Sequence, residues 1–332
     1  MLTNKDITGV AVMAPTPCVE GGEHWSNGNS VDLEETARMT ENLIRDGVGS
    51  IAACGTTGEC AALLWDEKVS FIDTIVQVNR GRVPVFAGAT SLGTKETIRQ
   101  MKAFQAIGAQ GAFVGLPLWQ TPTIENSIRW YADLSEAVPE MGIMVYSNAM
   151  FFKSVFPLEF WLGVAERAPR VITNKITSPA ITEKLEEIVE KTGDRISYLP
   201  LDGGAYSAWQ RVGDKIRGLW STSASMGPEP PVALSDAINR GDEERMKEIV
   251  ADMRSIPAFR PSDQADAEKF LQFPQLNVQA EKARFRAAGY IKCGPSRAPY
   301  LYDDMPDDWK AAAEANGKGW AQMRKKYIKA AV

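Results

Sequence analysis

Lys175 is the residue of this chain whose surroundings point most directly to chemistry. It lies in the middle of Val171–Thr177, a segment rich in β-branched residues whose composition predicts a buried strand. An unpaired ammonium is so unfavourable in a protein interior that it usually loses its proton, and a neutral amine is a nucleophile. Because side chains alternate along a strand, Lys175 shares one face with Thr173 and Thr177. The segment predicts either an amine that forms a Schiff base with a carbonyl, or a lysine that reaches solvent or a carboxylate from a strand end.

Short β-branched runs alternate with amphipathic stretches along the part of the chain that contains Lys175. Strands are predicted at Ile7–Ala14, Ser50–Cys54, Val83–Ala89, Gly111–Leu116, Gly142–Asn148, Val171–Thr177, Ile196–Leu201 and Ile216–Thr222. Helices are predicted at Leu33–Asp46, Asp66–Arg80, Lys95–Ile107, Ile124–Ala137, Leu158–Ala168, Ile181–Lys191, Ala205–Val212 and Val232–Arg240. Eight consecutive βα units favour an α/β fold with a closed (β/α)8 TIM barrel over an open doubly wound sheet. We expect the barrel to occupy residues 1–241.

The remaining residues, 242–332, show helical periodicity and no further strand pattern. Helices are predicted at Glu243–Ser255, Asp263–Gln272, Leu276–Ile291 and around Trp309–Ile328. A proline-rich segment, Cys293–Pro299, precedes the last of them. We expect a C-terminal helical extension of the barrel.

Composition excludes several kinds of partner. A net charge of −5, a pI near 5.3 and the lack of a Lys/Arg run exclude a nucleic-acid partner. No stretch approaches the roughly 18 apolar residues that cross a bilayer, and the first residues lack the apolar core of a signal peptide, so we expect a cytoplasmic protein. The four cysteines, Cys18, Cys54, Cys60 and Cys293, have no metal-ligand spacing, and His24 is the only histidine. We expect no metal.

Polar residues gather where three of the predicted strands end. Gly55-Thr56-Thr57-Gly58 follows the second strand, Tyr146-Ser147-Asn148 ends the fifth, and Trp220-Ser221-Thr222 ends the eighth. Active sites of (β/α)8 barrels lie at this carboxyl end of the strands. Taken one at a time, the three segments also fit a turn, a core tyrosine and an aromatic plug of the barrel.

Together with Lys175, these segments suit an α-keto acid. Gly55 and Gly58 would let the backbone approach a ligand, and their amides with the Thr57 hydroxyl would hold a carboxylate. The ketone carbon would then lie within reach of Lys175, and the phenol of Tyr146 could relay protons. This is the layout of a class I aldolase.

Gly55-Thr56-Thr57-Gly58-Glu59, Tyr146 and Lys175, in this order, resemble the dihydrodipicolinate synthase and N-acetylneuraminate lyase family over essentially the whole chain. The chain departs from dihydrodipicolinate synthase at Trp119, where that enzyme has a tyrosine, and at Phe151, where it has a carboxylate-binding arginine. It looks instead like the hydratase-aldolases of aromatic degradation that act on benzylidenepyruvates. The segments that carry this narrower resemblance are Gly58–Ala61, Trp65–Lys68, Leu116–Trp119, Tyr146–Asn148, Trp220–Ser221, Leu276–Val278, Glu281–Arg284 and Lys292–Pro295.

The resemblance implies a role for each matching residue. As catalytic residues it implies Lys175 as the nucleophile, Tyr146 and Thr56 as the proton relay, and Asn148 and Asn277 as the amides that set this branch apart. As substrate-binding residues it implies Thr57 with Gly55 and Gly58 at the pyruvoyl carboxylate, Trp119 and Trp220 at the aryl ring, and Ser221. An uncharged amide can orient a water and hold a hydroxyl without competing for its proton. The resemblance also implies a homotetramer.

The predicted activity is the conversion of an ortho-substituted trans-benzylidenepyruvate and water to an aromatic aldehyde and pyruvate, without a cofactor. A 2-carboxy ring is preferred, because of what near relatives use, and a 2-hydroxy ring is the alternative. Another pyruvate aldolase or a keto-acid dehydratase also fits the family. A barrel that only binds a keto acid as a sensor is the hypothesis outside the enzymes, and an intact set of Lys175, Tyr146 and Thr57 disfavours it.

Overall fold

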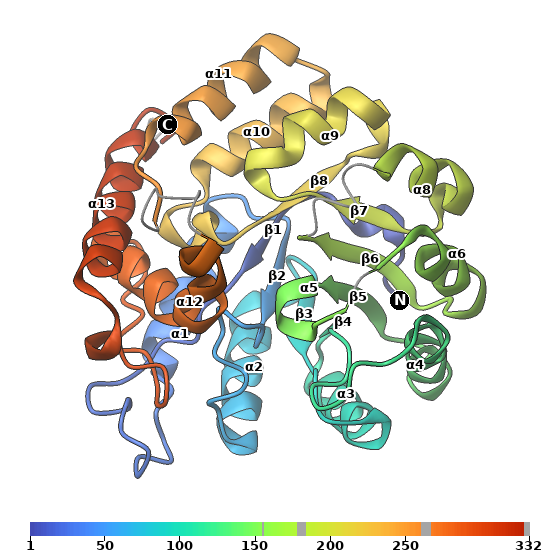
Figure 1. The fold of residues 1–332 in the computed structure, drawn as a ribbon, viewed down its shortest axis with the longest axis horizontal. Helices are drawn as coiled ribbons and strands as arrows, with labels where there is room; N and C mark the ends of the chain where they lie inside the picture. Colours follow the sequence, from blue (N-terminus) through green and yellow to red (C-terminus); the bar gives the residue numbers. More distant parts are fainter. Residues whose placement is uncertain (155, 178–183, 260–266, 329–332) are drawn as a thin grey trace.

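A barrel of eight parallel strands, enclosed by helices, forms the centre of the molecule (Figure 1). The computed structural model describes residues 1–154, 156–177, 184–259 and 267–328. The strands are β1 (Gly9–Met13), β2 (Ser50–Ala53), β3 (Val85–Gly88), β4 (Gly111–Val114), β5 (Gly142–Ser147), β6 (Val171–Ile176), β7 (Ser197–Leu199) and β8 (Gly218–Ser221). Neighbours follow the order β7-β6-β5-β4-β3-β2-β1-β8, and a parallel bridge between Leu201 and Trp220 joins the two ends. The predicted (β/α)8 TIM barrel is confirmed.

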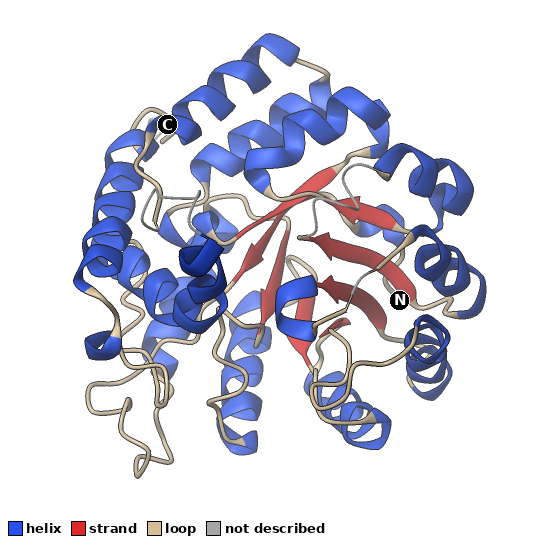
Figure 2. Cartoon of the chain, in the orientation of Figure 1, coloured by secondary structure: helices blue, strands red, loops and turns tan. Residues whose placement is uncertain are grey.

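Helices alternate with the strands and form the outer layer (Figure 2). The helices of the barrel are α1 (Leu33–Arg45), α2 (Trp65–Asn79), α3 (Thr94–Ile107), α4 (Ile124–Ala137), α5 (Ala149–Phe152), α6 (Leu158–Arg167), α8 (Leu185–Thr192), α9 (Ala205–Val212) and α10 (Glu229–Arg240). Every residue of β2 to β8 is buried, as expected for parallel strands covered by helices on the outside and packed side chains inside. No helix among the described residues is long and apolar enough to cross a membrane.

The C-terminal helices are α11 (Glu243–Ser255), α12 (Ala267–Ala288) and α13 (Asp307–Arg324). The sequence predicted two helices on either side of Pro274, but α12 runs through this proline. A proline inside a helix removes one hydrogen bond, and here the helix is supported by its packing against α13 (Figure 1). The start of the predicted helix Asp263–Gln272 and the predicted residues 181–183 lie outside the described residues.

A buried ionic cluster fastens the C-terminal extension to the loop after β2. The carboxylate of Glu59 accepts hydrogen bonds from Lys282 Nζ at 2.7 Å, from Arg297 Nη1 at 2.6 Å and from the Arg297 amide at 2.7 Å. Arg297 also donates to the carbonyl groups of Thr16 and Ser30 in the loop after β1. The three charged side chains are at most 3% exposed. The cluster therefore holds α12 and the loop after β2 in fixed positions.

Breaking this cluster should destabilise the fold strongly. Glu59→Gln leaves two buried cations without a counter-ion, so we expect the free energy of unfolding to fall by about 3–5 kcal/mol. The exposed pair Arg167–Glu125 is the control, and Glu125→Gln should change that free energy by less than about 1 kcal/mol. Urea unfolding followed by circular dichroism measures both. Equal effects of the two substitutions would show that the cluster contributes little.

Candidate active site

Lys175 lies inside the barrel, opposite Tyr146 in the register of β5 and β6. Its Nζ is 3.6 Å from the ring centroid of Trp220, 4.5 Å from that of Tyr146 and 3.4 Å from the hydroxyl of Thr177. No carboxylate forms an ion pair with it within the part of the chain that the structure describes. Burial lowers the pKa of Lys175 to about 7, although the negative charge of Glu281 opposes the change. A large fraction of this amine is therefore neutral, and nucleophilic, near pH 7.

The phenol of Tyr146 is held by two neighbours. Its hydroxyl shares a 3.0 Å hydrogen bond with that of Thr56, and the amide of Asn148 donates to it at 3.5 Å. The ring stacks on Phe113 with 4.6 Å between centroids. Burial raises the pKa of Tyr146 to about 12, so the phenol keeps its proton at neutral pH. It can act as an acid beside Lys175.

A small niche lies between Lys175 and the loop after β2. It measures about 10 Å³, and its walls include Thr56, Thr57 and Tyr146. The backbone amides of Thr56 and Thr57 have no acceptor among the described residues. Free amides beside a hydroxyl suit an anionic oxygen. The niche has room for about one water-sized group, which suits a single oxygen of a pyruvoyl carboxylate.

The two glycines of this loop are needed by the protein itself. A Cβ at Gly55 would lie 2.8 Å from the ring of Phe113, and one at Gly58 would lie 2.9 Å from the amide nitrogen of Cys54. Both separations are shorter than side chains tolerate. The glycines therefore let the loop pack closely against Phe113 and Cys54, and this packing shapes the niche beside them.

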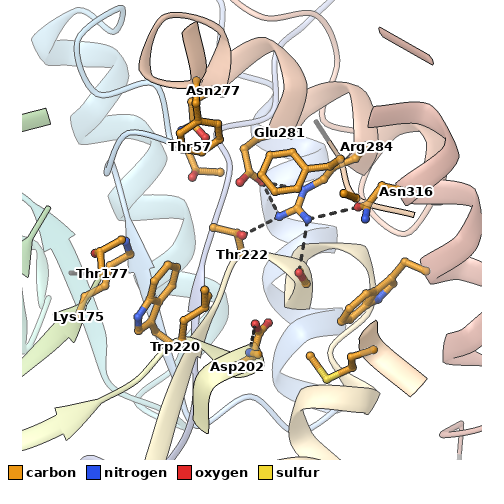
Figure 3. A pocket seen from close by; sticks show the side chains of 18 of the residues that line it. Thr57, Lys175, Thr177, Asp202, Trp220, Thr222, Asn277, Glu281, Arg284 and Asn316 are labelled. Carbon is orange, nitrogen blue, oxygen red and sulfur yellow. Dashed lines mark hydrogen bonds and ion pairs between the residues drawn. The ribbon is translucent and has the colours of Figure 1, made fainter. Parts of the chain in front are cut away.

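A larger cavity of about 400 Å³ opens next to Lys175, between the barrel and the C-terminal extension (Figure 3). From the barrel side it is lined by Thr57, Tyr146, Asn148, Lys175, Thr177 and Trp220, and from α12 and α13 by Asn277, Glu281, Arg284, Asn316 and Trp320. The indole of Trp220 is fixed by a 2.7 Å hydrogen bond from Nε1 to the carbonyl of Ile176. Cavities of this size bind small molecules. The volume suits an aryl group attached to a pyruvoyl unit.

Helix α12 presents one polar face to this cavity. Asn277, Glu281 and Arg284 are spaced by four and three residues, which places them on the same side of the helix (Figure 3). Nη2 of Arg284 donates to Glu281 at 2.7 Å and to the hydroxyl of Thr222 at 2.6 Å. Its Nη1 donates to Asn316 on α13 at 3.3 Å. The buried guanidinium is therefore occupied by protein partners, whereas the amide of Asn277 has none among the described residues.

Ser221 and Trp119 do not line either space, so their predicted contact with substrate stays a prediction that these two spaces do not support. The hydroxyl of Ser221 is buried, donates to Asp202 at 2.5 Å and accepts the amide of Ala224 at 2.9 Å. Trp119 is 83% exposed and lies on the loop after β4, where the Leu118 amide donates to the carbonyl of Ser91. Of Trp119 and Trp220, the two tryptophans predicted to contact the aryl ring, Trp220 lines the cavity within one chain and Trp119 does not.

Asn148 lies at the cavity but is already engaged. Its Oδ1 accepts the amides of Met150 and Phe151 and so caps the short helix α5, which the sequence did not predict. Its amide nitrogen donates to Tyr146. Asn148 therefore orients the phenol and α5, and the free amide that faces the cavity is that of Asn277.

Sequence reasoning left three charged residues of the cavity without a role. Glu281 and Arg284 were visible as an acidic and a basic residue three positions apart on a predicted helix, a common surface pair. Asp202 follows β7, where its buried carboxylate accepts Ser221 and the Gly203 amide, and burial raises its pKa. Its position at the end of a strand was the available signal. No cluster of three or more His, Cys, Asp or Glu side chains that could hold a metal ion occurs among the described residues.

Comparison with known proteins places the chain in a family. Residues 24–264 match the model of the dihydrodipicolinate synthetase family. The chain belongs to this family. It is 38% identical over 332 residues to a trans-O-hydroxybenzylidenepyruvate hydratase-aldolase of Pseudomonas aeruginosa, an alignment that covers 98% of this chain and 96% of the relative.

Two further relatives extend the comparison. A trans-2'-carboxybenzalpyruvate hydratase-aldolase of Nocardioides sp. is 33% identical, with 98% of this chain and 97% of the relative covered. The solved structure described as PhdJ bound to substrate intermediate superimposes with a TM-score of 0.91 at 31% identity, covering 98% of this chain and 99% of that one. The predicted resemblance to the hydratase-aldolase branch of the family is therefore confirmed.

The low pKa of Lys175 should control how fast the protein reacts with pyruvate. Only the neutral amine attacks a ketone, so the rate of imine formation should rise with pH up to about 7 and level off above it. A lysine with the ordinary pKa of 10.5 would instead react faster up to about pH 10. Rapid-quench trapping with cyanoborohydride between pH 5 and pH 10 gives this profile. A rate that keeps rising above pH 9 would contradict the account of a desolvated amine.

Proposed function

We propose that this protein is a class I hydratase-aldolase, a carbon–carbon lyase that converts an ortho-substituted trans-benzylidenepyruvate and water to an aromatic aldehyde and pyruvate. The observation that carries the proposal is the buried, unpaired amine of Lys175, which lies opposite Tyr146 and beside a cavity of about 400 Å³. A protein that only binds a keto acid has no use for such an amine. The names of the relatives support the same activity.

The reaction begins with a Schiff base. Lys175 condenses with the C2 ketone and releases water, while the pyruvoyl carboxylate binds the amides and hydroxyl at Thr56 and Thr57. The iminium is conjugated to the C3–C4 double bond, so C4 becomes electrophilic. Water adds at C4, and protonation of the resulting enamine at C3 restores the iminium. The iminium serves as the electron acceptor, so the proposal requires no cofactor.

Cleavage follows from the hydrated intermediate. Loss of the proton from the C4 hydroxyl breaks the C3–C4 bond, the aldehyde leaves, and the electron pair is taken up by the iminium as an enamine. Tyr146, neutral and hydrogen-bonded to Thr56, donates the proton that the enamine needs at C3. Hydrolysis of the last iminium releases pyruvate and restores Lys175.

The charges around the cavity favour a 2-hydroxy ring over the 2-carboxy ring preferred from the sequence. Two carboxylates, Asp202 and Glu281, line it, and the buried guanidinium of Arg284 is already paired. Apart from Lys175 and Arg284, the cation that lines the cavity among the described residues is Arg254, which is exposed. A second substrate carboxylate would meet like charge there, whereas a phenol can donate to a carboxylate or to Asn277. We therefore propose trans-o-hydroxybenzylidenepyruvate as the substrate and salicylaldehyde as the aldehyde.

We also propose a cytoplasmic homotetramer. Leu92, Leu118 and Trp119 are exposed apolar side chains on the loops after β3 and β4, which supports an interface at that edge of the barrel. All four cysteines are free thiols, which supports a reducing compartment.

Synthetic substrates test the activity and the ring together. Purified protein is given trans-o-hydroxybenzylidenepyruvate or trans-2'-carboxybenzalpyruvate, and pyruvate and aldehyde are quantified by chromatography. We expect both products in equal amounts, with kcat/KM for the hydroxy compound at least about tenfold higher, a difference of about 1.4 kcal/mol in the transition state. Faster turnover of the carboxy compound would contradict the assignment of the ring. Turnover of neither would contradict the hydratase-aldolase itself.

A further inference from the structure

Glu281 holds one oxygen free inside the cavity. Its side chain is 6% exposed, and both hydrogen bonds from Arg284 go to Oε2. Its Oε1 has no hydrogen-bond partner among the described residues. Figure 3 shows the carboxylate directed from α12 into the cavity, with Thr57 and Thr222 beside it and Lys175 entering from the barrel. The pairing with Arg284 thus holds Oε2 in place, and Oε1 is available to accept a proton or a hydrogen bond.

The position of this carboxylate is set by its partner. Arg284 is tied to Thr222 on the barrel and to Asn316 on α13, so the pair cannot swing freely. The negative charge of Glu281 also acts on both reacting groups. It raises the pKa of Lys175, against the larger lowering by burial, and it adds to the raised pKa of Tyr146. Glu281 therefore lines the same cavity as Lys175 and Tyr146 and acts on both electrostatically.

The proposed reaction needs a base twice. A proton must leave the water that adds to C4, and another must leave the C4 hydroxyl when C3–C4 breaks. Tyr146 is protonated, Lys175 is committed to the iminium, and the amides of Asn148 and Asn277 are not basic. Of the two carboxylates that line the cavity, Asp202 uses its oxygens for Ser221 and Gly203.

We propose that Glu281 is the general base of both steps, an inference that rests on the proposed function. In the first step its Oε1 takes a proton from water as the oxygen bonds to C4. The C3–C4 π pair becomes the C2–C3 double bond of an enamine, and the C2–N π pair moves to the nitrogen. That proton is returned at C3, through Tyr146 or directly, and the iminium forms again. In the second step Oε1 takes the C4 hydroxyl proton, C3–C4 breaks, and the aldehyde leaves with the enamine behind. After Tyr146 has protonated the enamine at C3, the proton on Glu281 passes back to the phenolate and restores both groups. The sum consumes one water and no other reagent.

Glu281→Gln separates this role from imine formation. The variant keeps the size of the side chain and an oxygen for Arg284, but it has no basic carboxylate. We expect trapping of pyruvate by borohydride within a few-fold of wild type, and kcat for trans-o-hydroxybenzylidenepyruvate reduced by about 10²–10⁴-fold with KM little changed. The hydrated intermediate, supplied as 4-hydroxy-4-(2-hydroxyphenyl)-2-oxobutanoate, should also be cleaved slowly. Glu229→Gln, which alters an Arg-paired glutamate outside the cavity, is the matched control and should turn over normally.

Chemical rescue distinguishes a base from a structural residue. In Glu281→Ala a small carboxylate can occupy the space of the missing side chain, so added formate should restore part of the turnover, while chloride at equal ionic strength should not. Glu281→Asp keeps a carboxylate displaced by one methylene, so it should turn over more slowly than wild type and faster than Glu281→Gln. If Glu281→Gln and Glu281→Ala do not fold, Glu281→Asp decides the question: a folded Asp variant that traps pyruvate normally but shows no turnover would overturn the proposal.

Other results would overturn the proposal in recognisable ways. Normal turnover by Glu281→Gln, or loss of turnover in Asp202→Asn alone, would place the base elsewhere. Loss of pyruvate trapping in Glu281→Gln would mean that the residue supports imine formation instead. Failure of the wild type to trap pyruvate would count against the proposed function and not against this inference about Glu281.

Discussion

The desolvated amine of Lys175 is the feature on which the rest of the site depends. Its pKa of about 7, against an ordinary 10.5, corresponds to roughly 5 kcal/mol of preference for the neutral form. The barrel enforces this preference by placing the amine under the indole of Trp220 and across from Tyr146. The negative charge of Glu281 favours the ammonium and so limits how far the pKa of Lys175 falls. The ion pair of Glu281 with Arg284 weakens this effect. The amine is consequently poised near neutral pH.

Two parts of the chain divide the chemistry between them. The barrel carries Lys175, Tyr146 and the niche beside Thr57, to which we assign the nucleophile, the proton donor and the carboxylate site of a pyruvate aldolase. Helix α12 adds Asn277 and Glu281, the polar groups suited to the water and the C4 hydroxyl. The buried cluster of Glu59, Lys282 and Arg297 ties the two parts together through the loop that carries Thr57. The position of Asn277 and Glu281 over the barrel therefore depends on an ionic cluster outside the cavity.

The sequence predicted the repeating units and the central lysine because both leave local signals. Strand and helix periodicity marks each βα unit, and a lysine within β-branched residues is conspicuous at any distance from its partners. The direction of a side chain leaves no such signal. Ser221 donates to Asp202, which lies 19 residues earlier in the chain, and Trp119 is exposed; local periodicity predicts neither orientation. The continuity of α12 through Pro274 depends likewise on packing against α13, which local propensity does not contain.

Mass spectrometry after reduction with borohydride in the presence of pyruvate tests the central claim most directly, because reduction converts a transient imine into a stable bond. The account predicts one reduced pyruvate adduct per chain, on the peptide that contains Lys175, and none in Lys175→Ala. It also predicts that the other lysines of the chain stay unmodified, since exposed lysines are protonated at neutral pH and the buried Lys282 is held in an ion pair with Glu59. An unmodified wild-type chain, or an adduct that persists in Lys175→Ala, would contradict the Schiff-base mechanism.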